Sequence, residues 1–290
     1  MNVVAQAVEG SIVVGSIYGM LGVGFALLFR SSKVLSFCQG GFMLLGAFIF
    51  YDFVTAKRPL LVSILVTVVL VGVFSGLVYL VVFARVAARE AFATSVATIG
   101  LAGVLQTIVA VRYGTAPLSL PDVVSTRAFH VFSSVVTVVD IVAVAMAAVV
   151  VTVLMVLLRF TALGQRMNAV ADNASLSEHL GISSARVAAI AWALAGGAAA
   201  LAGIAFSLRT SVDPVGVANI GLFAFPAIIL GGLDSVGGAM LGGILLGLIQ
   251  NLVQVFVGAQ WVDLVSFAVM LAFLFLRPSG LFGKTEVIRL

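Results

Sequence analysis

The feature that most limits how this chain can fold is a series of long apolar blocks separated by short polar intervals. A helix needs about 20 apolar residues to cross the roughly 30 Å hydrocarbon core of a bilayer. The blocks cover residues 5–29, 34–56, 60–83, 91–111, 133–158, 187–206, 220–231, 236–257 and 260–276. None has the alternating ten-residue pattern of a membrane β-barrel. The sequence therefore predicts one all-α polytopic membrane domain over residues 1–290, with about eight to ten membrane segments, some of them short or broken.

Composition excludes the soluble classes of protein. Hydrophobic residues make up 62% of the chain and charged residues 9%, whereas about a quarter of a soluble protein is charged. We assign the net charge of +4 to loop side chains that face the cytoplasm or lipid headgroups, not to a nucleic-acid surface. Cys38 is the only cysteine, so no disulfide forms within the chain. His130 and His179 lack metal-ligand spacing, and no catalytic set of serine, histidine and carboxylate is present, so we expect neither a metal site nor an active site.

Charged residues in the short loops predict the topology, because cytoplasmic loops are enriched in Lys and Arg. The proposed cytoplasmic residues are Arg30, Lys33, Arg85, Arg89, Arg159 and Arg166, with Arg277, Lys284 and Arg289 of the tail. Lys57, Arg58, Arg112 and Arg209 then fall outside, so the bias is modest. This arrangement places Met1 outside and requires block 220–231 to be a short crossing. A re-entrant half-helix is the alternative, and it would leave the tail outside.

Two interruptions within the apolar pattern combine glycines with polar residues. The first is Phe37–Gly41, which contains Gln39, Gly40 and Gly41. The second is Leu230–Gly238, which contains Gly231, Gly232, Asp234, Gly237 and Gly238. Unwound backbone at membrane depth is tolerated where it is buried in protein or lines a watery cavity, and paired broken segments are typical of transporters. We predict that both interruptions lie near the transport pathway. The alternative is a simple loop, or glycines that only permit close helix packing.

The interval 159–186 is the longest polar interval between two thick apolar blocks, so it lies outside the bilayer. Its first half, Leu163–Ala171, is compatible with a helix. Ser175 precedes Glu178 by three residues, the spacing of a capping box, and Gly181 is a typical helix stop. Leu176 and Leu180, four residues apart, form an apolar stripe. A helix this short needs a docking partner, because isolated helices require roughly 12 to 15 residues to be stable in water.

Polar residues inside the predicted spans are candidates for function, each with a structural alternative. Asp140 lies early in its block, where it is either a functional carboxylate or a helix-start residue near the outer headgroups. Gln250 and Gln254 share one helix face, which suits either a wet lumen or hydrogen bonds between helices. Because a proton- or sodium-coupled carrier usually has more buried carboxylates, energy coupling within this chain alone is disfavoured.

Four stretches together resemble the permeases of branched-chain amino acid ABC importers. The segment from Met167 to Ile182, MNAVADNASLSEHLGI, resembles their cytoplasmic coupling segment. The other three are GSIYGML at 15–21 with LSFCQGGFMLLG at 35–46, DPVG at 213–216 followed by 225–247, and RPSGLF at 277–282. They occur in family order over nearly the whole chain. Its length and short N-terminus resemble the smaller, H-type permease subunit.

The resemblance implies a type II importer-like permease in the bacterial cytoplasmic membrane. Its implied partners are a second, related permease, two cytoplasmic ATP-binding subunits that hold ATP and Mg, and an extracytoplasmic solute-binding protein. No cofactor is expected on this chain. The residues implied to contact the ATPase are Ala171, Asp172, Asn173, Ser175, Leu176, Glu178, Leu180 and Gly181.

One departure from the family leaves the transported solute open. Many members carry an Asn-Phe-Ala-His-Gly-like run where this chain has SFCQG at 36–40. If the chain is an importer permease, its solute is a branched-chain amino acid, a related amino acid or a similar small polar molecule. The competing interpretation is a stand-alone ion- or proton-coupled carrier, which the co-purification of ATPase subunits would exclude.

Overall fold

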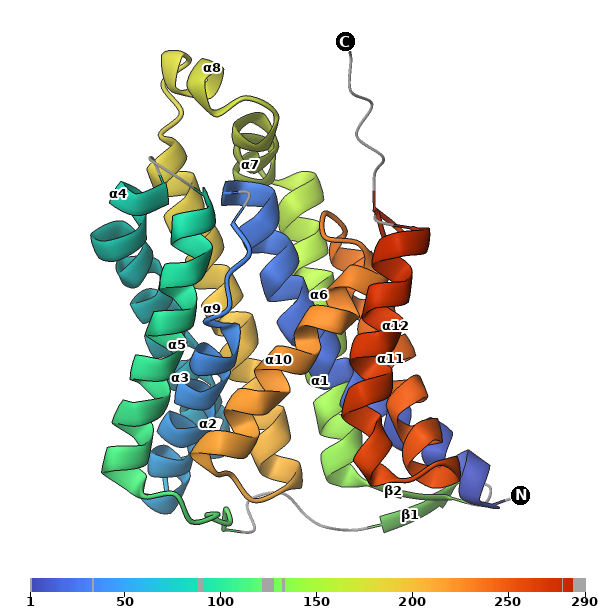
Figure 1. Cartoon of the computed structure of the whole chain (residues 1–290). Helices are drawn as coiled ribbons and strands as arrows, with labels where there is room; N and C mark the ends of the chain where they lie inside the picture. The colour runs from blue at the N-terminus through green and yellow to red at the C-terminus, as the bar shows by residue number, and fades with distance from the viewer. Residues whose placement is uncertain are drawn as a thin grey trace.

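The protein is a bundle of long helices with a short hairpin at one end (Figure 1). The computed structural model describes residues 2–32, 34–87, 91–121, 128–131, 134–277 and 279–283. Its long helices are α1 (Asn2–Ser32), α2 (Gln39–Thr55), α3 (Leu60–Val78), α5 (Ala91–Tyr113), α6 (Val138–Phe160), α9 (Ser184–Arg209), α10 (Pro214–Gly231), α11 (Val236–Phe256) and α12 (Val262–Leu276). Within the described residues, 8 helices are long and apolar enough to cross a membrane, and α2 is a shorter apolar helix. The predicted all-α membrane fold is confirmed.

Shorter elements complete the described chain. A π-helical turn (Tyr79–Phe83) and α4 (Ala84–Ala87) continue α3, and a 3-10 turn (Ala259–Trp261) precedes α12. Two short helices, α7 (Ala162–Asp172) and α8 (Ala174–His179), connect α6 to α9 and project from one end of the bundle (Figure 1). At the other end, strands β1 (Ala128–Val131) and β2 (Ser134–Thr137) pair antiparallel, with Ala128 opposite Thr137.

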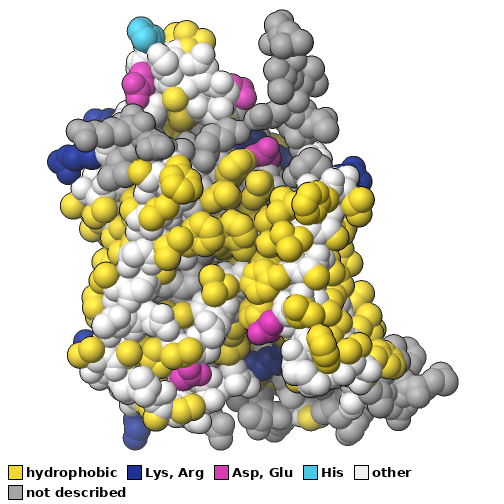
Figure 2. Space-filling model, in the orientation of Figure 1, with side chains coloured by type: hydrophobic (Ala, Val, Ile, Leu, Met, Phe, Trp, Pro, Cys, Tyr) yellow, Lys and Arg dark blue, Asp and Glu magenta, His cyan; other side chains and the backbone are white. Residues whose placement is uncertain are grey.

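The ends of the helices agree with the predicted sidedness. Arg277, which follows α12, lies at the same end of the bundle as α7 and α8, and the N-terminal end of α1 lies at the opposite end (Figure 1). The α7/α8 end also carries Arg30, Arg85, Arg159, Arg166 and Arg186. Lys33, Arg89, Lys284 and Arg289, used in the same prediction, lie outside the described residues. Figure 2 shows a hydrophobic belt across the middle of one face, with Lys and Arg gathered toward the two ends.

Two of the four Lys and Arg residues that the prediction places outside form ion pairs at the end opposite α7 and α8. Arg112 pairs with Asp52 and Arg209 pairs with Asp140, each at 3.1 Å. Each Arg therefore has a carboxylate partner at this end, and both still count against the predicted excess of Lys and Arg at the α7/α8 end.

Three predicted boundaries were wrong. The short block 220–231 belongs to α10, which begins at Pro214 because Asp213 caps it, its carboxylate accepting from the Gly216 N–H at 2.7 Å. With 18 residues, α10 reaches roughly 27 Å, long enough for a crossing rather than a re-entrant half-helix. Block 133–158 begins with β2, and α6 starts only at Val138. Block 34–56 begins with extended chain, and α2 starts only at Gln39.

Glycine faces bring α1 and α11 into backbone contact. A Cβ atom on Gly243 would lie 2.5 Å from the backbone nitrogen of Gly19, and one on Gly247 would lie 2.8 Å from that of Gly15. Each helix contributes two glycines four residues apart to this contact, Gly15 and Gly19 on α1 and Gly243 and Gly247 on α11. Because lipid tails are as apolar as the helices, such close packing replaces the hydrophobic driving force that acts in water.

Helix α9 occupies the centre of the bundle. Most of its residues are buried, and it packs against α1, α2 and α3. The contacts are again made by small residues, since a Cβ on Gly72 would lie 2.9 Å from the Ala193 carbonyl oxygen and one on Gly203 would lie 2.2 Å from that of Met43. Trp192 fills the remaining space and stacks on Phe83, with ring centroids 4.9 Å apart.

The glycine contacts predict a position-dependent effect of one methyl group. Gly243→Ala should destabilise the protein by about 1 to 3 kcal/mol, because the new Cβ meets backbone atoms that cannot rotate away. Gly103→Ala is the matched control, since nothing lies within 4 Å of its Cβ and alanine favours a helix by up to about 1 kcal/mol. The unfolding temperature of the purified protein, followed by tryptophan fluorescence, measures both. Equal shifts would contradict the packing role.

The topology predicts opposite labelling of two introduced cysteines. The native Cys38 is fully buried and gives little background. Ser175→Cys, exposed in α8, should react with a membrane-impermeant maleimide only after the inner face is opened. Thr115→Cys, exposed at the far end of α5, should react in intact cells. Labelling of the α8 cysteine from outside would overturn the orientation.

Candidate functional site

Helix α7 is fixed to the body of the bundle. Thr161 caps its start, and Gly164 lies so close to α6 that a Cβ there would be 2.1 Å from the Leu158 carbonyl oxygen. Met167 and Val170 are buried in the main core. The Arg30 guanidinium, near the end of α1, donates a hydrogen bond to the Asn168 side chain. Together these contacts make α7 an extension of the membrane helices.

The N-cap of helix α8 is a different residue from the predicted one. Asn173, not Ser175, is the N-cap, and its side-chain oxygen accepts from the Leu176 N–H at 2.9 Å. The Ser175–Glu178 capping box was therefore wrong, because the helix begins two residues earlier than that box requires, at Ala174, and Ser175 lies inside it. Ala171 and Asp172 belong to the last turn of α7.

The end of α8 is the predicted glycine stop. Gly181 has a φ of 82°, which glycine adopts without strain. Its N–H donates to the Glu178 carbonyl, and the Ile182 N–H donates to the Ser177 carbonyl, both at 2.9 Å. This pair of bonds is a Schellman motif, which satisfies carbonyls that the helix leaves free.

The apolar stripe of α8 faces solvent. Leu176 is 58% exposed and Leu180 is 72% exposed, and Asp172, Asn173, Ser175 and Glu178 are exposed around them. Only Ser177 is buried within this short helix. Two exposed leucines on a helix held at both ends form an apolar contact surface that the described chain leaves uncovered.

The first interruption is unwound, but over different residues from those predicted. Residues 34–38 are not helical, and α2 starts below the α7/α8 end (Figure 1). Val34, Ser36 and Cys38 are almost completely buried, and the Phe37 N–H donates to Thr98 Oγ1 at 2.9 Å. The backbone is thus lined by protein, one of the two environments that tolerate it.

Gln39, Gly40 and Gly41 form the first turn of α2. A Cβ on Gly40 would lie 2.9 Å from the Ala218 carbonyl oxygen of α10, and one on Gly41 would lie 2.9 Å from Leu105 of α5. The Gln39 side chain is fully buried beside Gly24 of α1, and its amide has no hydrogen-bond partner among the described residues. The two glycines permit close packing, and a pathway role for these residues stays a prediction.

The second interruption is a tight turn, held by the C-terminal segment. Gly231 ends α10, Gly232 has a φ of 107°, and Ser235 caps α11. The Leu281 N–H donates to the Leu230 carbonyl at 2.9 Å, and the Phe282 N–H donates to the Gly231 carbonyl at 3.0 Å. Residues 279–283, which we name the C-terminal clasp, therefore satisfy the free carbonyls of α10. The motif at 277–282 was visible in the sequence, but its contact with the turn was not.

The other residues of this turn also contact protein. Gly238 packs against the Gly231 carbonyl, and Gly237 faces Met155 of α6. Asp234 is half-buried in the turn. The two interruptions are not adjacent, because Gly40 packs on Gly221, which precedes Gly231 by roughly 15 Å along α10. Their proximity to the pathway stays a prediction.

Gln250 forms hydrogen bonds between helices, one of the two alternatives for this residue. Tyr18 of α1 donates to Gln250 Oε1, and Gln250 Nε2 donates to Ser266 Oγ of α12, both at 2.9 Å. Gln254, one turn later, lines a cavity of ≈ 550 Å³ with Tyr18 and Arg209. The polar face of α11 is therefore bonded to other helices at one position and open at the next.

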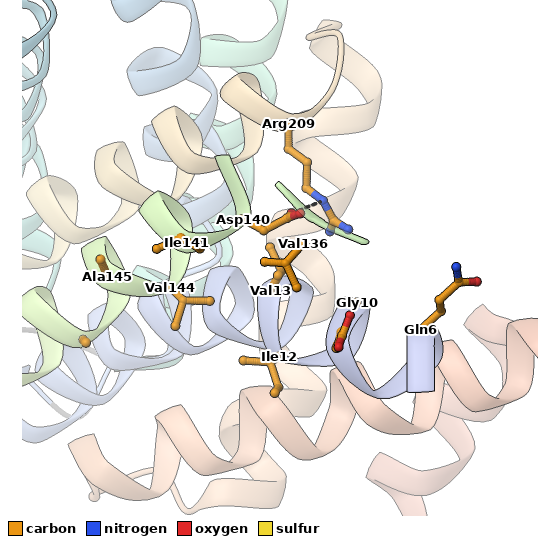
Figure 3. Close-up of a pocket in the computed structure, with 12 residues that line it drawn as sticks. Gln6, Gly10, Ile12, Val13, Val136, Asp140, Ile141, Val144, Ala145 and Arg209 are labelled. Atoms are coloured by element: carbon orange, nitrogen blue, oxygen red, sulfur yellow. Dashed lines mark ion pairs between the residues drawn. The ribbon is translucent and has the colours of Figure 1, made fainter. Parts of the chain in front are cut away.

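Asp140 has the structural role that the sequence left open. It forms a reciprocal capping box with Thr137 at the start of α6, and its Oδ1 atom lies 3.1 Å from Arg209 Nε of α9. Figure 3 shows this pair beside a cavity of ≈ 500 Å³ between α1 and α6. Among the described residues, no group of three or more His, Cys, Asp or Glu side chains could hold a metal ion.

Comparison with known proteins gives a consistent assignment. A family model described as "Branched-chain amino acid transport system / permease component" matches residues 7–274. The chain is 24% identical to the high-affinity branched-chain amino acid transport system permease protein LivH of Salmonella typhimurium, over 97% of this chain and 96% of that protein. It is 23% identical to BraD of Pseudomonas aeruginosa, described in the same words, with the same coverage. The solved structure of PsaBC from Streptococcus pneumoniae in complex with Fab covers 96% of this chain and 93% of that chain, with 12% identity and a TM-score of 0.49.

The corrected cap of α8 predicts unequal effects of two alanine substitutions. Asn173→Ala should speed amide hydrogen exchange in residues 174–180 roughly two- to thirtyfold, since an N-cap contributes about 0.5 to 2 kcal/mol. Ser175→Ala is the control, because the Ser175 hydroxyl makes no hydrogen bond to a described residue. Mass spectrometry of exchanged peptides measures both. Faster exchange in Ser175→Ala alone would restore the original assignment.

Proposed function

Because the chain belongs to the branched-chain amino acid transport system permease family, we propose that it forms, with a second related permease, the membrane pathway of an ATP-driven amino-acid importer. The chain is a multi-pass permease subunit of the bacterial inner membrane, and such a subunit works in a complex with others. The solute we propose is a branched-chain or closely related amino acid, since LivH and BraD are named for that transport.

The proposed complex supplies what this chain lacks. Two cytoplasmic ATP-binding subunits would hold ATP and Mg and hydrolyse the nucleotide, and an extracytoplasmic solute-binding protein would deliver the amino acid. This chain would bind no cofactor itself and would have no enzymatic activity.

The observation that carries the coupling proposal is the exposed apolar stripe on an anchored helix pair. Leu176 and Leu180 of α8 face solvent, while α7 is fixed by the burial of Met167 and by the Arg30–Asn168 hydrogen bond. An ATPase can drive a permease only through an element that contacts both proteins and does not deform when the ATPase moves. We therefore assign α8 as the ATPase contact and α7 as its connection to the membrane helices, with Ala171 to Gly181 as the coupling residues.

The competing interpretation, a stand-alone ion-coupled carrier, gains no support from Asp140, the carboxylate that the sequence places inside a predicted span. Asp140 is engaged by its own helix cap and by Arg209, so it is not a free ion-binding group. Coupling by a separate ATPase requires no such carboxylate within the bundle.

Leu176→Asp should abolish substrate-stimulated ATP hydrolysis and weaken ATPase association about 10- to 100-fold. This is the effect of losing roughly 1.5 to 3 kcal/mol of leucine burial, and the added charge makes it larger. The measurement uses the complete transporter reconstituted in vesicles, with association followed by co-purification. Pairing with the second permease should be unchanged.

Ala185→Asp is the matched control, because it adds the same charge at the same end of the molecule, on α9 rather than α8, at an exposed position. It should leave stimulation near the wild-type level. Wild-type stimulation in Leu176→Asp would show that the ATPase contact lies elsewhere.

A further inference from the structure

The cavity between α1 and α6 at the outer end of the bundle changes from polar to apolar with depth. On α1, which runs inward from the outer end, Gln6 and Glu9 precede Ile12 and Val13. On α6, Asp140 precedes Val144 and Ala148 in the same direction. Figure 3 shows the polar residues Gln6 and Arg209 toward one end and Val144 and Ala145 toward the other. An occupant therefore has a polar end at the membrane surface and an apolar body that points inward.

The polar end offers one group of each charge. The Glu9 carboxylate has no ion pair or hydrogen bond to any residue that the structure describes. Arg209 uses Nε for Asp140, which leaves its two terminal nitrogens to bind an anion. This combination complements a headgroup that carries both a cation and an anion.

The lining also selects the kind of cation. Quaternary ammonium groups are usually bound by aromatic side chains, and none of the lining residues that the structure describes is aromatic. A carboxylate instead suits an ammonium group that can donate hydrogen bonds. The cavity therefore favours a primary ammonium over choline.

The length of the cavity decides between a lipid and an amino acid. The lining of α6 extends from Asp140 to Ala148, or roughly 12 Å along the helix. A free branched-chain amino acid would fill only the outer end, because its side chain is much shorter, whereas an acyl chain would fill the whole length. The volume of ≈ 500 Å³ lies within the range of about 300 to 1,000 Å³ that is common for ligand pockets.

We propose that this cavity binds one outer-leaflet phospholipid with an ethanolamine headgroup. Its ammonium group pairs with Glu9, its phosphate pairs with the free nitrogens of Arg209, and one acyl chain lies along α6 as far as Ala148. The bound lipid bridges α1 and α6 at the outer end.

Native mass spectrometry of the purified full-length chain tests this site. The protein is mixed with equal amounts of palmitoyl-oleoyl phosphatidylethanolamine, phosphatidylglycerol and phosphatidylcholine, and the lipid retained after gas-phase delipidation is identified. The wild type should retain one phosphatidylethanolamine molecule in preference to the other two. Glu9→Gln should reduce that preference roughly fivefold, the loss expected for a partly exposed ion pair.

Ala148→Trp tests the deep end, since the indole ring would occupy the space assigned to the acyl chain, and it should reduce retention of all three lipids. Ala145→Phe, about one turn closer to the surface, gives an independent result should the first variant aggregate. The matched controls are Asp263→Asn, an exposed carboxylate at the outer end, and Val156→Trp, an exposed position of α6 outside the cavity. Both should retain phosphatidylethanolamine like the wild type.

Three results would overturn the proposal. Equal retention of phosphatidylethanolamine and phosphatidylcholine by the wild type would show that the ammonium group is not recognised. Unchanged retention in both cavity-filling variants would show that no chain lies along α6. Displacement of the bound lipid by leucine, or by a co-purified second permease, would assign the cavity to an amino acid or to a protein interface.

Discussion

This structure depends on the close approach of helix backbones, which the glycine and alanine faces of the helices allow. In water, large apolar side chains drive helices together, but in lipid they gain nothing from leaving one apolar medium for another. The α1–α11 contact and the burial of α9 rest instead on dispersion and close fit, with backbone atoms of one helix against those of the next. A single methyl group at such a contact displaces a whole helix, so the arrangement has few degrees of freedom.

A second constraint is that each backbone group inside the membrane needs a partner. The bundle meets it at its two interruptions in different ways. The chain before α2 is enclosed by other helices and bonded to Thr98, whereas the turn after α10 is satisfied by the C-terminal clasp. The clasp also connects the last membrane helix to the α10–α11 turn. Movement of α12 relative to α10 would therefore break backbone hydrogen bonds, which makes this end of the bundle one unit.

The helix pair α7 and α8 combines rigidity with exposure. Helix α7 shares the buried core of the membrane helices, and α8 is short, capped at both ends, and apolar on its exposed face. A flexible loop would deform when a partner moved against it and would not transmit the movement. A buried helix could not contact the partner at all. The hydrogen bond from Arg30 to Asn168 extends the connection to α1, a helix that packs on both α11 and α9.

The sequence by itself determined the membrane class, the approximate spans, the charged loops that lie at the same end of the bundle and the polar interval that contains α7 and α8. These features follow from local properties: the length of apolar runs, the positions of Lys and Arg, and the glycine that stops a helix at position 181. Family likeness added the importer role and the contact segment, which composition alone could not supply. Close helix packing through glycines was one of the alternatives that the sequence offered, but the packing partners were not identifiable, because a glycine face does not encode which helix it meets.

Only the tertiary structure decided the rest. It showed that Asn173 rather than Ser175 caps α8, because both residues are good caps and the fit of α8 between α7 and α9 selects one register. It assigned Asp140 to a cap and an ion pair, because its partner Arg209 is distant in the sequence. It showed that protein, and not water, satisfies the backbone at the interruption 230–238, because the residues that bond it arrive from the end of the chain. In each case the local signal was present, and the choice among its readings depended on a contact between segments far apart in the sequence.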